Sequence, residues 1–523
     1  MSTSNCPLDW KKGAPNETPS NGQRPRQFSG YLSPDIGIIG HHLPAYRKMA
    51  VANTNMLTGC GHTDGAARAR RITGGLPPGG ILLTDSGAQS PFRISPEPFP
   101  LPQETVSTLA RQGRLWLKFL KAAQEIYFRA TRGEAPGFVV EYLDAGKPER
   151  LIEFGRMNRF RQRFAPVIRP DILLTDGGLS ACELDSVPGG FGLLDCLSRL
   201  YAREGCVPVG GADGMCAGFM RAMEYAAGRE KPAIAIAVSD ESRMYLPEMR
   251  WMAEMVGAAG GWCRAVAPAD LQAGPDGVRL KDVRLDAIYR FFELFDLPNL
   301  PSAGELFSAA KMKQVALTPP PKPFLEEKLL FALLHHPALA GLWEECLGEP
   351  EFVELRSIVI PTWVMDSRPI PPHAVIAGLL AGGKPLSSWK GLERLTQRER
   401  EFVVKPSGFS ENAWGSHGVS FGQDLSRGDW MEAVNEALEA FPERPHVIQP
   451  YRRPSIVPVR WLDATTGEIR EGEGRVRLTP YYFVTGPDEA ELSGILATIC
   501  PTDKKAVHGM PDAVMAPCIA VPE

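Results

Sequence analysis

Two short runs in which polar and apolar residues alternate flank an Asp-Gly-Gly sequence at residues 176–178. Alternation with a period of two is typical of β-strands, and a glycine-containing turn between such runs predicts a hairpin. With a three-residue loop, pairing is symmetric about the middle glycine, so Asp171 lies opposite Glu183 and Arg169 lies opposite Asp185. These four side chains share one face, and the other face is formed by Ile168, Pro170, Ile172, Leu174, Cys182 and Leu184.

The shared face of the hairpin gathers three carboxylates and one arginine. Like charges directly opposite one another destabilise a strand pair, so something must offset the repulsion between Asp171 and Glu183. Hard divalent cations prefer carboxylate oxygens, which makes this face a candidate magnesium site. The alternative is a solvated hairpin in which Arg169 and Asp185 form a surface ion pair and the other acids have no function.

Apolar residues recur at helical spacing on both sides of the hairpin, over residues 102–132, 192–201 and 214–227. A buried strand is predicted at 232–238, followed by a helix at 247–256 and a strand at 262–266.

This β-α-β order is typical of a parallel sheet that is covered on both faces. Ser239 and Asp240 follow the first strand, where they predict either a ligand site or a turn with a helix N-cap.

The last third of the chain alternates strands and helices beyond a Pro-rich stretch at 317–323. The pattern predicts a helix at 324–334, a strand at 401–405, a glycine-bearing loop at 407–422, a helix at 428–441, and strands at 446–451 and 474–484.

Shifts in composition suggest four segments. Residues 1–30 are polar and predicted to be disordered. A Gly/Pro-rich, irregular segment with one long helix covers 31–150. The acidic hairpin and an α/β domain cover 151–316, and a nucleotide-binding region covers 317–523.

The composition is that of an ordinary globular protein, with 523 residues, 44% hydrophobic and 23% charged. A net charge of −4 gives no bulk electrostatic reason to expect nucleic acid or an acidic membrane as a partner. No apolar run approaches the about 20 residues of a membrane span, and the first residues lack the apolar core of a signal peptide. We therefore expect a cytoplasmic protein.

The order of parts in the last third resembles an ATP-grasp nucleotide site. A lysine ends the strand at 401–405, a Gly/Ser loop follows, and a later strand ends in Gln449-Pro-Tyr451. In that family the carboxylates that hold magnesium usually come later in the chain. Here the acidic hairpin precedes these parts by more than two hundred residues. This order resembles the circularly permuted ATP-grasp family, which includes the synthetase domain of glutathionylspermidine synthetase.

A motif strengthens the resemblance. In the permuted family, Arg-x-Asp is followed after eleven residues by Glu-x-Asn, and the Asp, Glu and Asn bind magnesium. This chain has Arg169-x-Asp171, eleven residues, and then Glu183-x-Asp185, so the last ligand is Asp in place of Asn. Residues 285–290 also resemble the Asp-x-Ile-Tyr-Arg-Arg segment of permuted relatives. Residues 1–100 match nothing in the family, and its cysteine amidase domain is missing.

The resemblance implies an α/β (α+β) fold, a circularly permuted ATP-grasp with a preceding small three-layer domain. It implies that Asp171, Glu183 and Asp185 bind magnesium and that Arg169 reaches the acceptor carboxylate or the transferred phosphoryl group. Arg477 is the implied transition-state arginine, with Arg475, two residues away on the same face, as the alternative.

Nucleotide-binding roles are implied for further residues. Lys405 corresponds to the lysine at the α/β phosphates. Lys328 resembles an upstream lysine, although a solvated helix position is the alternative. Adenine would lie at Gln449 and Tyr451, and the 407–422 loop, with Gly415 and Ser416, would close over the phosphates.

The function implied is an ATP- and Mg-dependent ligase that joins a small-molecule or peptide carboxylate to an amine through an acyl phosphate. The alternatives are a non-catalytic nucleotide-binding or scaffold protein of the same fold and an ATP-grasp kinase of small molecules. The substrates and the oligomeric state stay open.

Other residues offer competing sites. A zinc site is one, from residues close in sequence without a standard finger spacing: His41, His42, Cys60 and His62. Cys60 as a nucleophile is a second, and His508 as a residue lining the site is a third. Cys182 and Cys196 are expected to be small buried residues.

Overall fold

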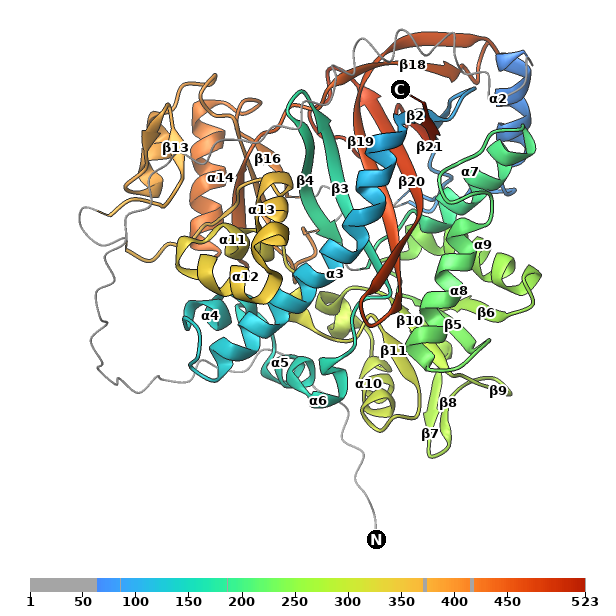
Figure 1. Cartoon of the computed structure of the whole chain (residues 1–523), viewed down its shortest axis with the longest axis horizontal. Helices are drawn as coiled ribbons and strands as arrows, with labels where there is room; N and C mark the ends of the chain where they lie inside the picture. Colours follow the sequence, from blue (N-terminus) through green and yellow to red (C-terminus); the bar gives the residue numbers. More distant parts are fainter. Residues whose placement is uncertain (1–63, 85, 186, 370–373, 414–417, 523) are drawn as a thin grey trace.

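The computed structural model describes residues 64–84, 86–185, 187–369, 374–413 and 418–522 (Figure 1). The segment predicted to be disordered, 1–30, lies outside these ranges. So do the histidines and the cysteine of the zinc and nucleophile hypotheses.

An eight-stranded sheet forms the centre of the molecule, with strand order β1-β21-β20-β19-β3-β4, β2 beside β21 and β18 beside β19. Its strands are β1 (Arg93–Ile94), β2 (Phe99–Pro102), β3 (Val167–Thr175), β4 (Gly178–Asp185), β18 (Ile456–Leu462), β19 (Ile469–Gly486), β20 (Glu489–Pro501) and β21 (Val514–Val521). The strands come from both ends of the chain, so the sheet joins segments that are far apart in sequence.

Each face of this sheet is covered differently. Helix α3 (Gln103–Thr131), predicted from its periodicity, lies along one face in Figure 1 and shares a core with Ile172 and Leu478. Helices α7 (Phe191–Arg203) and α8 (Gly214–Ala227) pack on part of the other face, with Phe483. Because side chains alternate along a strand, the residues between the α3-facing ones, such as Asp171 and Arg477, point to the second face.

The predicted hairpin is β3 and β4, and the two predicted cross-strand pairs are confirmed: Arg169 with Asp185 and Asp171 with Glu183. The predicted three-residue loop is wrong, because Thr175 already pairs with Gly178. The register shifts by one after Asp171, since β4 carries an extra residue there. The predicted loop is one residue too long, and the bulge that was not predicted shifts the register by one residue in the opposite sense. The two errors therefore cancel at the acidic pairs.

The predicted β-α-β unit is confirmed as a parallel sheet with strand order β11-β10-β5-β6. It contains β5 (Ala233–Val238), β6 (Trp262–Val266), β10 (Ala287–Phe291) and β11 (Ala316–Thr318), with α9 (Leu246–Ala258) between β5 and β6. Ser239 Oγ accepts a hydrogen bond from Ser242 N at 3.3 Å, the local turn that was one of its two predicted roles.

A third, antiparallel sheet has strand order β12-β17-β15-β16. It comprises β12 (Trp363–Val364), β15 (Phe402–Pro406), β16 (Ser420–Phe421) and β17 (His446–Pro450), and α14 (Arg427–Glu439) packs on it. These elements confirm the strands and the helix predicted over 401–451.

Two further expectations were wrong. The helix predicted at 324–334 begins only at α11 (Leu329–His335), because a 3-10 turn, Pro323–Leu325, precedes it. The segment expected to be irregular contains helix α2 (Gly65–Gly74), whose first turn is capped by the Asp64 side chain, which accepts from Ala66 N.

The remaining helices include α4 (Phe138–Asp144), α5 (Glu149–Arg156), α6 (Asn158–Arg161), α10 (Ala303–Lys311), α12 (Ala340–Leu347) and α13 (Glu349–Ile358). Within the part of the chain that the structure describes, no helix is both long and apolar enough to cross a membrane.

Candidate active site

A cavity of about 580 Å³ lies against the second face of the central sheet and is also lined by the antiparallel sheet. Its size is within the usual range of small-molecule sites. The structure brings the predicted site residues of the described chain to its wall: Arg169, Asp171, Glu183, Asp185, Lys328, Lys405, Gln449, Tyr451 and Arg477. Gly415 and Ser416 lie outside the described residues.

Basic side chains pair with each acid of the hairpin. Arg477 Nη1 lies 2.7 Å from Asp171 Oδ2, and Arg169 Nη2 lies 2.9 Å from Asp185 Oδ2. Arg169 Nε is also 3.3 Å from Asp171 Oδ1. The side chains of Arg169 and Asp185 are 15% and 29% exposed, and that of Asp171 is 6% exposed, so the pair of Arg169 with Asp185 is not a solvated surface pair.

Two lysines from distant segments share the third acid. Lys328 Nζ lies 2.8 Å from Glu183 Oε1, and Lys405 Nζ lies 3.8 Å from Glu183 Oε2. Burial alone would raise the pKa of Glu183, but these two ammonium groups outweigh it and lower the pKa to about 2. Glu183 is therefore ionised throughout the physiological pH range.

Four cations thus offset the repulsion predicted between the acids of the hairpin. Arg169 belongs to the hairpin itself, and Arg477, Lys328 and Lys405 come from other segments of the chain. Burial raises the pKa of Asp185, against the opposing effect of Arg169. Burial would lower the pKa of Arg169, yet Asp171 and Asp185 keep it well above its usual value. An anionic ligand can compete for these cations, and a metal ion can compete for these acids.

The lysines are fixed by backbone carbonyls. Lys328 Nζ donates to Ala413 O at 2.6 Å, within the glycine-bearing loop. Lys405 Nζ donates to Cys182 O at 2.9 Å, in the bulge of β4. Lys328 is therefore no solvated helix residue.

Of the residues predicted to hold adenine, Gln449 lies beside Lys405, because its Nε2 is 3.4 Å from Cys182 O, which also accepts from Lys405 Nζ. Gln449 is buried, and its Nε2 donates to Thr362 Oγ1 at 2.9 Å. The ring of Tyr451 meets that of Phe421 edge to face, with centroids 5.8 Å apart. The rings of Tyr451 and Phe421 make the cavity wall near the end of β17 partly apolar.

The two candidate arginines of β19 have different partners. Arg477 contacts Asp171, whereas Arg475 Nη1 donates to Lys504 O at 2.9 Å and to Tyr451 Oη at 3.4 Å. His508 lines the cavity from the C-terminal segment. Cys196 is buried as expected, but Cys182 lies half-buried at the cavity wall, where burial raises its thiol pKa to about 11.

A buried ion pair, which the sequence did not predict, holds the segment that carries Lys328. Lys147 Nζ lies 2.6 Å from Glu327 Oε1, and both side chains are fully buried. Ser407 Oγ also bonds Glu327, and Leu329 N donates to Ser407 Oγ at 2.9 Å. The segment that carries Lys328 is thereby tied to the end of β15, two residues after Lys405.

The carboxylate oxygens at the cavity wall are suitable ligands for magnesium, but they do not enclose a metal ion. Across the described ranges, no three carboxylate, imidazole or thiolate groups lie close enough to enclose a metal ion. Asp171 Oδ1 is buried and accepts no hydrogen bond from the described residues. Since magnesium is usually held by one or two carboxylates together with substrate phosphates and water, the donor chemistry fits.

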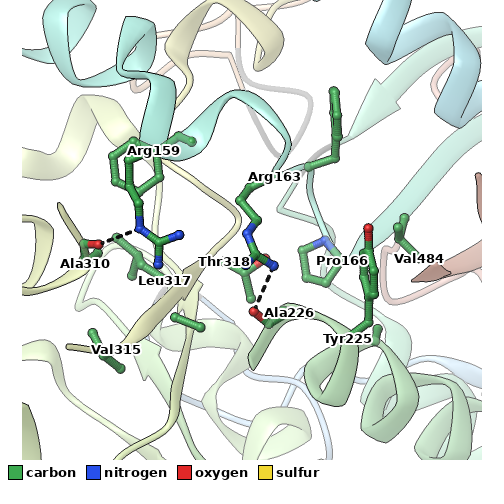
Figure 2. Close-up of a pocket in the computed structure, with 14 residues that line it drawn as sticks. Arg159, Arg163, Pro166, Tyr225, Ala226, Ala310, Val315, Leu317, Thr318 and Val484 are labelled. Atoms are coloured by element: carbon green, nitrogen blue, oxygen red, sulfur yellow. Dashed lines mark hydrogen bonds between the residues drawn. The ribbon is translucent and has the colours of Figure 1, made fainter. Parts of the chain in front are cut away.

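A second, smaller pocket has a structural role (Figure 2). There Arg159 Nε donates to Ala310 O at 3.3 Å and Arg163 Nη1 donates to Ala226 O at 3.2 Å. These carbonyls belong to the last turns of α10 and α8, where carbonyls lack helical partners. Burial and the neighbouring Arg163 lower the pKa of Arg159. The two arginines therefore donate hydrogen bonds to carbonyl groups at the C-terminal ends of α10 and α8.

The fold and the cavity together define a mixed α/β protein whose arrangement of sheets is found in a solved structure. A glutathione synthetase-like effector from Globodera pallida, solved in its apo form, matches with a TM-score of 0.51 and 13% identity, over 88% of this chain and 98% of that chain. At this identity the likeness concerns the fold. It confirms the predicted α/β class.

A candidate gamma-glutamylcysteine synthetase from Methylobacillus flagellatus matches with a TM-score of 0.36 and 11% identity, over 70% of this chain and 82% of that chain. That likeness is too distant to carry an argument. No protein-family model matches the chain, and no curated protein matches it in sequence.

Proposed function

We propose that the protein is an ATP- and magnesium-dependent ligase that joins a carboxylate to an amine. One observation carries the proposal: Lys328, Lys405 and Arg477 converge on the acidic hairpin within one cavity. Phosphoryl transfer relies on positioning and on neutralising charge, and this wall offers cations for phosphates beside carboxylates for a metal.

The reaction proceeds in two steps. A carboxylate oxygen of the acid attacks the γ-phosphorus of ATP, the bond to the β,γ-bridging oxygen breaks, and ADP leaves. The amine then attacks the carbonyl carbon of the acyl phosphate, loses a proton, and displaces inorganic phosphate. Arg169 and Arg477 would hold the acid and the transferred phosphoryl group, because a guanidinium binds such oxygens in bidentate fashion.

Lys328 and Lys405 would hold the phosphates of ATP. Both ammonium groups now contact Glu183, which would exchange them for metal as the phosphates arrive. Magnesium would be held by one or two of Asp171, Glu183 and Asp185, with substrate phosphates and water as its other ligands, and it neutralises phosphate charge when bound. Glu183 suits this role because its low pKa keeps it ionised.

The rest of the site follows the same proposal. Gln449 and Tyr451 would hold adenine, and the 407–422 loop, including Gly415 and Ser416, would cover the phosphates. The proposal includes the circularly permuted order of the parts, small-molecule or peptide substrates, no nucleic-acid or membrane partner, and a cytoplasmic setting.

The first test is a thermal-shift assay with ATP and magnesium, followed by a screen for ADP release over pairs of carboxylic acids and amines. With a productive pair, an ¹⁸O-labelled carboxylate should deliver one ¹⁸O to the released phosphate. A stable phosphorylated product would identify a kinase instead. Binding of Mg–ATP without any ADP release would favour a nucleotide-binding scaffold.

A further inference from the structure

The sheet face beneath the cavity changes from charged to apolar across its strands. β3 and β4 carry the arginine and the acids. On β19 and β20, Arg477 pairs with Thr498, and on β20 and β21, Thr498 pairs with Met515. Thr479, two residues from Arg477 on the same face, pairs with Leu496. The polar end of this face is therefore continuous with an apolar end.

Two hydroxyl groups mark the boundary between these ends. Thr479 and Thr498 are each 1% exposed, and both line the cavity. Neither Oγ1 has a hydrogen-bond partner among the described residues. Buried polar groups are nearly always hydrogen-bonded, so two orphan hydroxyls beside Arg477 point to a polar group that a ligand supplies.

The wall beyond the hydroxyls comes from the N-terminal part of the chain. Leu82, Leu83 and Phe92 are half-buried and line the cavity. Leu83 N donates to Met244 O at 3.0 Å, which ties this segment to another part of the wall. β1 pairs with β21 through Ile94 and Met515, which fixes its position against the sheet.

This wall is not suited to a charged group. Of the described residues that 82–92 and 242–245 contribute to the cavity, none is charged, and the polar ones are Ser90, Ser242 and Tyr245. Burying a charge without a partner is strongly unfavourable. A second carboxylate or an ammonium group would have no counter-charge on these two segments.

We propose that this end of the cavity is an apolar subsite and that the acid substrate is a carboxylate with a hydrocarbon body. The proposal deepens the ligase function and rests on it. The carboxylate lies between the arginines and the orphan threonine hydroxyls. The hydrocarbon contacts Leu82, Leu83, Phe92, Met244, Leu496 and Met515.

The test measures binding of straight-chain carboxylates from butanoate to decanoate by calorimetry, with the full chain and saturating Mg–ATP analogue. Succinate and glutamate are the hydrophilic probes. We expect affinity to rise about three- to fourfold per methylene until the subsite is filled. Succinate and glutamate should bind more weakly than hexanoate. Affinity that is independent of chain length, or tighter binding of glutamate, would overturn the proposal.

Matched variants locate the subsite. Leu83→Ser, with Leu83→Ala as the milder change, should weaken octanoate about tenfold and leave butanoate and the nucleotide unchanged. Leu380→Ser is the control, because Leu380 is 54% exposed and does not line the cavity. An equal loss for butanoate and octanoate would contradict the placement. If Mg–ATP itself does not bind, the ligase proposal fails; if it binds and chain length has no effect, the subsite alone fails.

Discussion

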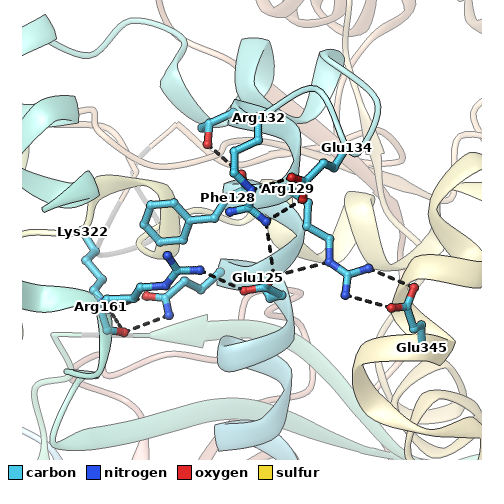
Figure 3. Close-up of polar contacts among 10 residues, drawn as sticks. Glu125, Phe128, Arg129, Arg132, Glu134, Arg161, Lys322 and Glu345 are labelled. Carbon is cyan, nitrogen blue, oxygen red and sulfur yellow. Dashed lines mark hydrogen bonds and ion pairs between the residues drawn. The ribbon is translucent and has the colours of Figure 1, made fainter. Parts of the chain in front are cut away.

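Two groups of ion pairs in this protein use the same chemistry in different surroundings. On the outer side of α3, Arg129 Nη2 lies 2.8 Å from Glu345 Oε1 and Arg132 Nη2 lies 2.7 Å from Glu134 Oε2 (Figure 3). The side chains of Glu345 and Glu134 are 59% and 54% exposed. In the cavity, by contrast, Asp171 is nearly covered and its two arginines come from strands β3 and β19.

The two groups of ion pairs differ in what can replace a lost partner. If an outer pair opens, water replaces the lost partner, so such pairs contribute little stability. If Asp171 or Glu183 loses its cations, only a ligand or a metal can replace them fully. Under the proposed function, a ligand or a metal ion would replace one partner of each cavity pair, whereas the α3 pairs are exposed to water.

Lys322, also in Figure 3, differs from both groups of ion pairs. It is buried, and its Nζ donates to Gln124 Oε1 and to Arg163 O, the latter at 2.6 Å. Burial and the nearby Arg161 lower its pKa well below the usual value. Its contacts fix the chain that leads into β3, so its role is structural.

The largest effect is expected at Arg169. Arg169→Lys keeps the charge but loses the fork that contacts Asp171, Asp185 and Gly189 O. ADP release with a productive substrate pair should fall about a hundredfold or more. The free energy of unfolding should fall by only about 1–2 kcal/mol, from lost hydrogen bonds. Near-normal turnover would refute a role in the chemistry.

Lys405 should distinguish phosphate binding from base binding. Lys405→Ala should weaken ATP about ten- to hundredfold, since a charge-assisted contact contributes about 1.5–3 kcal/mol. Adenosine, which lacks phosphates, should bind the variant and the wild type equally in the same titration. An equal loss for both ligands would give Lys405 a structural role through its bond to Cys182 O.

Glu248 makes the stability of the protein depend on pH. It is fully buried, and its carboxylate accepts from Gly190 N at 2.7 Å and Leu193 N at 2.9 Å, at the start of α7. Burial raises its pKa to about 7, against these hydrogen bonds. The folded state therefore binds a proton more tightly than the unfolded state, and this stabilisation is lost as pH rises from about 4.5 to 7.

Glu248→Gln should remove this contribution, worth about 3 kcal/mol across that pH range. Denaturant unfolding of both proteins at pH 4.5 and 7.5 measures it. Burial raises the pKa values of Glu293 and Glu326 in the same direction, but their effect cancels in the difference between the two proteins. Parallel stability curves would show that Glu248 does not titrate in this range.

The smallest effect is expected on the outer side of α3. Arg129→Ala removes the pair with Glu345, and unfolding free energy should fall by less than about 1 kcal/mol. Nucleotide affinity should not change. A loss of affinity would mean that the two groups of ion pairs are coupled, and it would contradict their treatment as independent.

Much of the site geometry was accessible from the sequence because strand parity is a local property. The alternation on both sides of residues 176–178 placed Asp171 opposite Glu183, even though the bulge at β4 was not predicted. The same parity places Thr479 on the face of Arg477, so the orphan hydroxyl had a sequence signal.

Other parts depend on tertiary placement that no local pattern encodes. Lys147 stands in a Gly-Lys-Pro loop typical of a surface, yet it pairs with Glu327 across 180 residues. The Gly/Pro-rich composition near Leu83 suggested irregular structure and gave no reason to expect a cavity wall. Sequence patterns therefore predicted the strand pairing of the hairpin better than the surroundings that enclose it.

The most direct test of the account is a calorimetric titration of Mg–ATP into wild-type protein, Glu183→Gln and the matched surface variant Glu345→Gln. We predict that wild type and Glu345→Gln bind alike and that Glu183→Gln loses at least about tenfold in magnesium-dependent affinity. Because Lys328 and Lys405 lose their partner, Glu183→Gln should also unfold more easily, not less. Equal magnesium-dependent affinity in all three proteins would contradict the central claim that the acidic hairpin is a nucleotide–metal site.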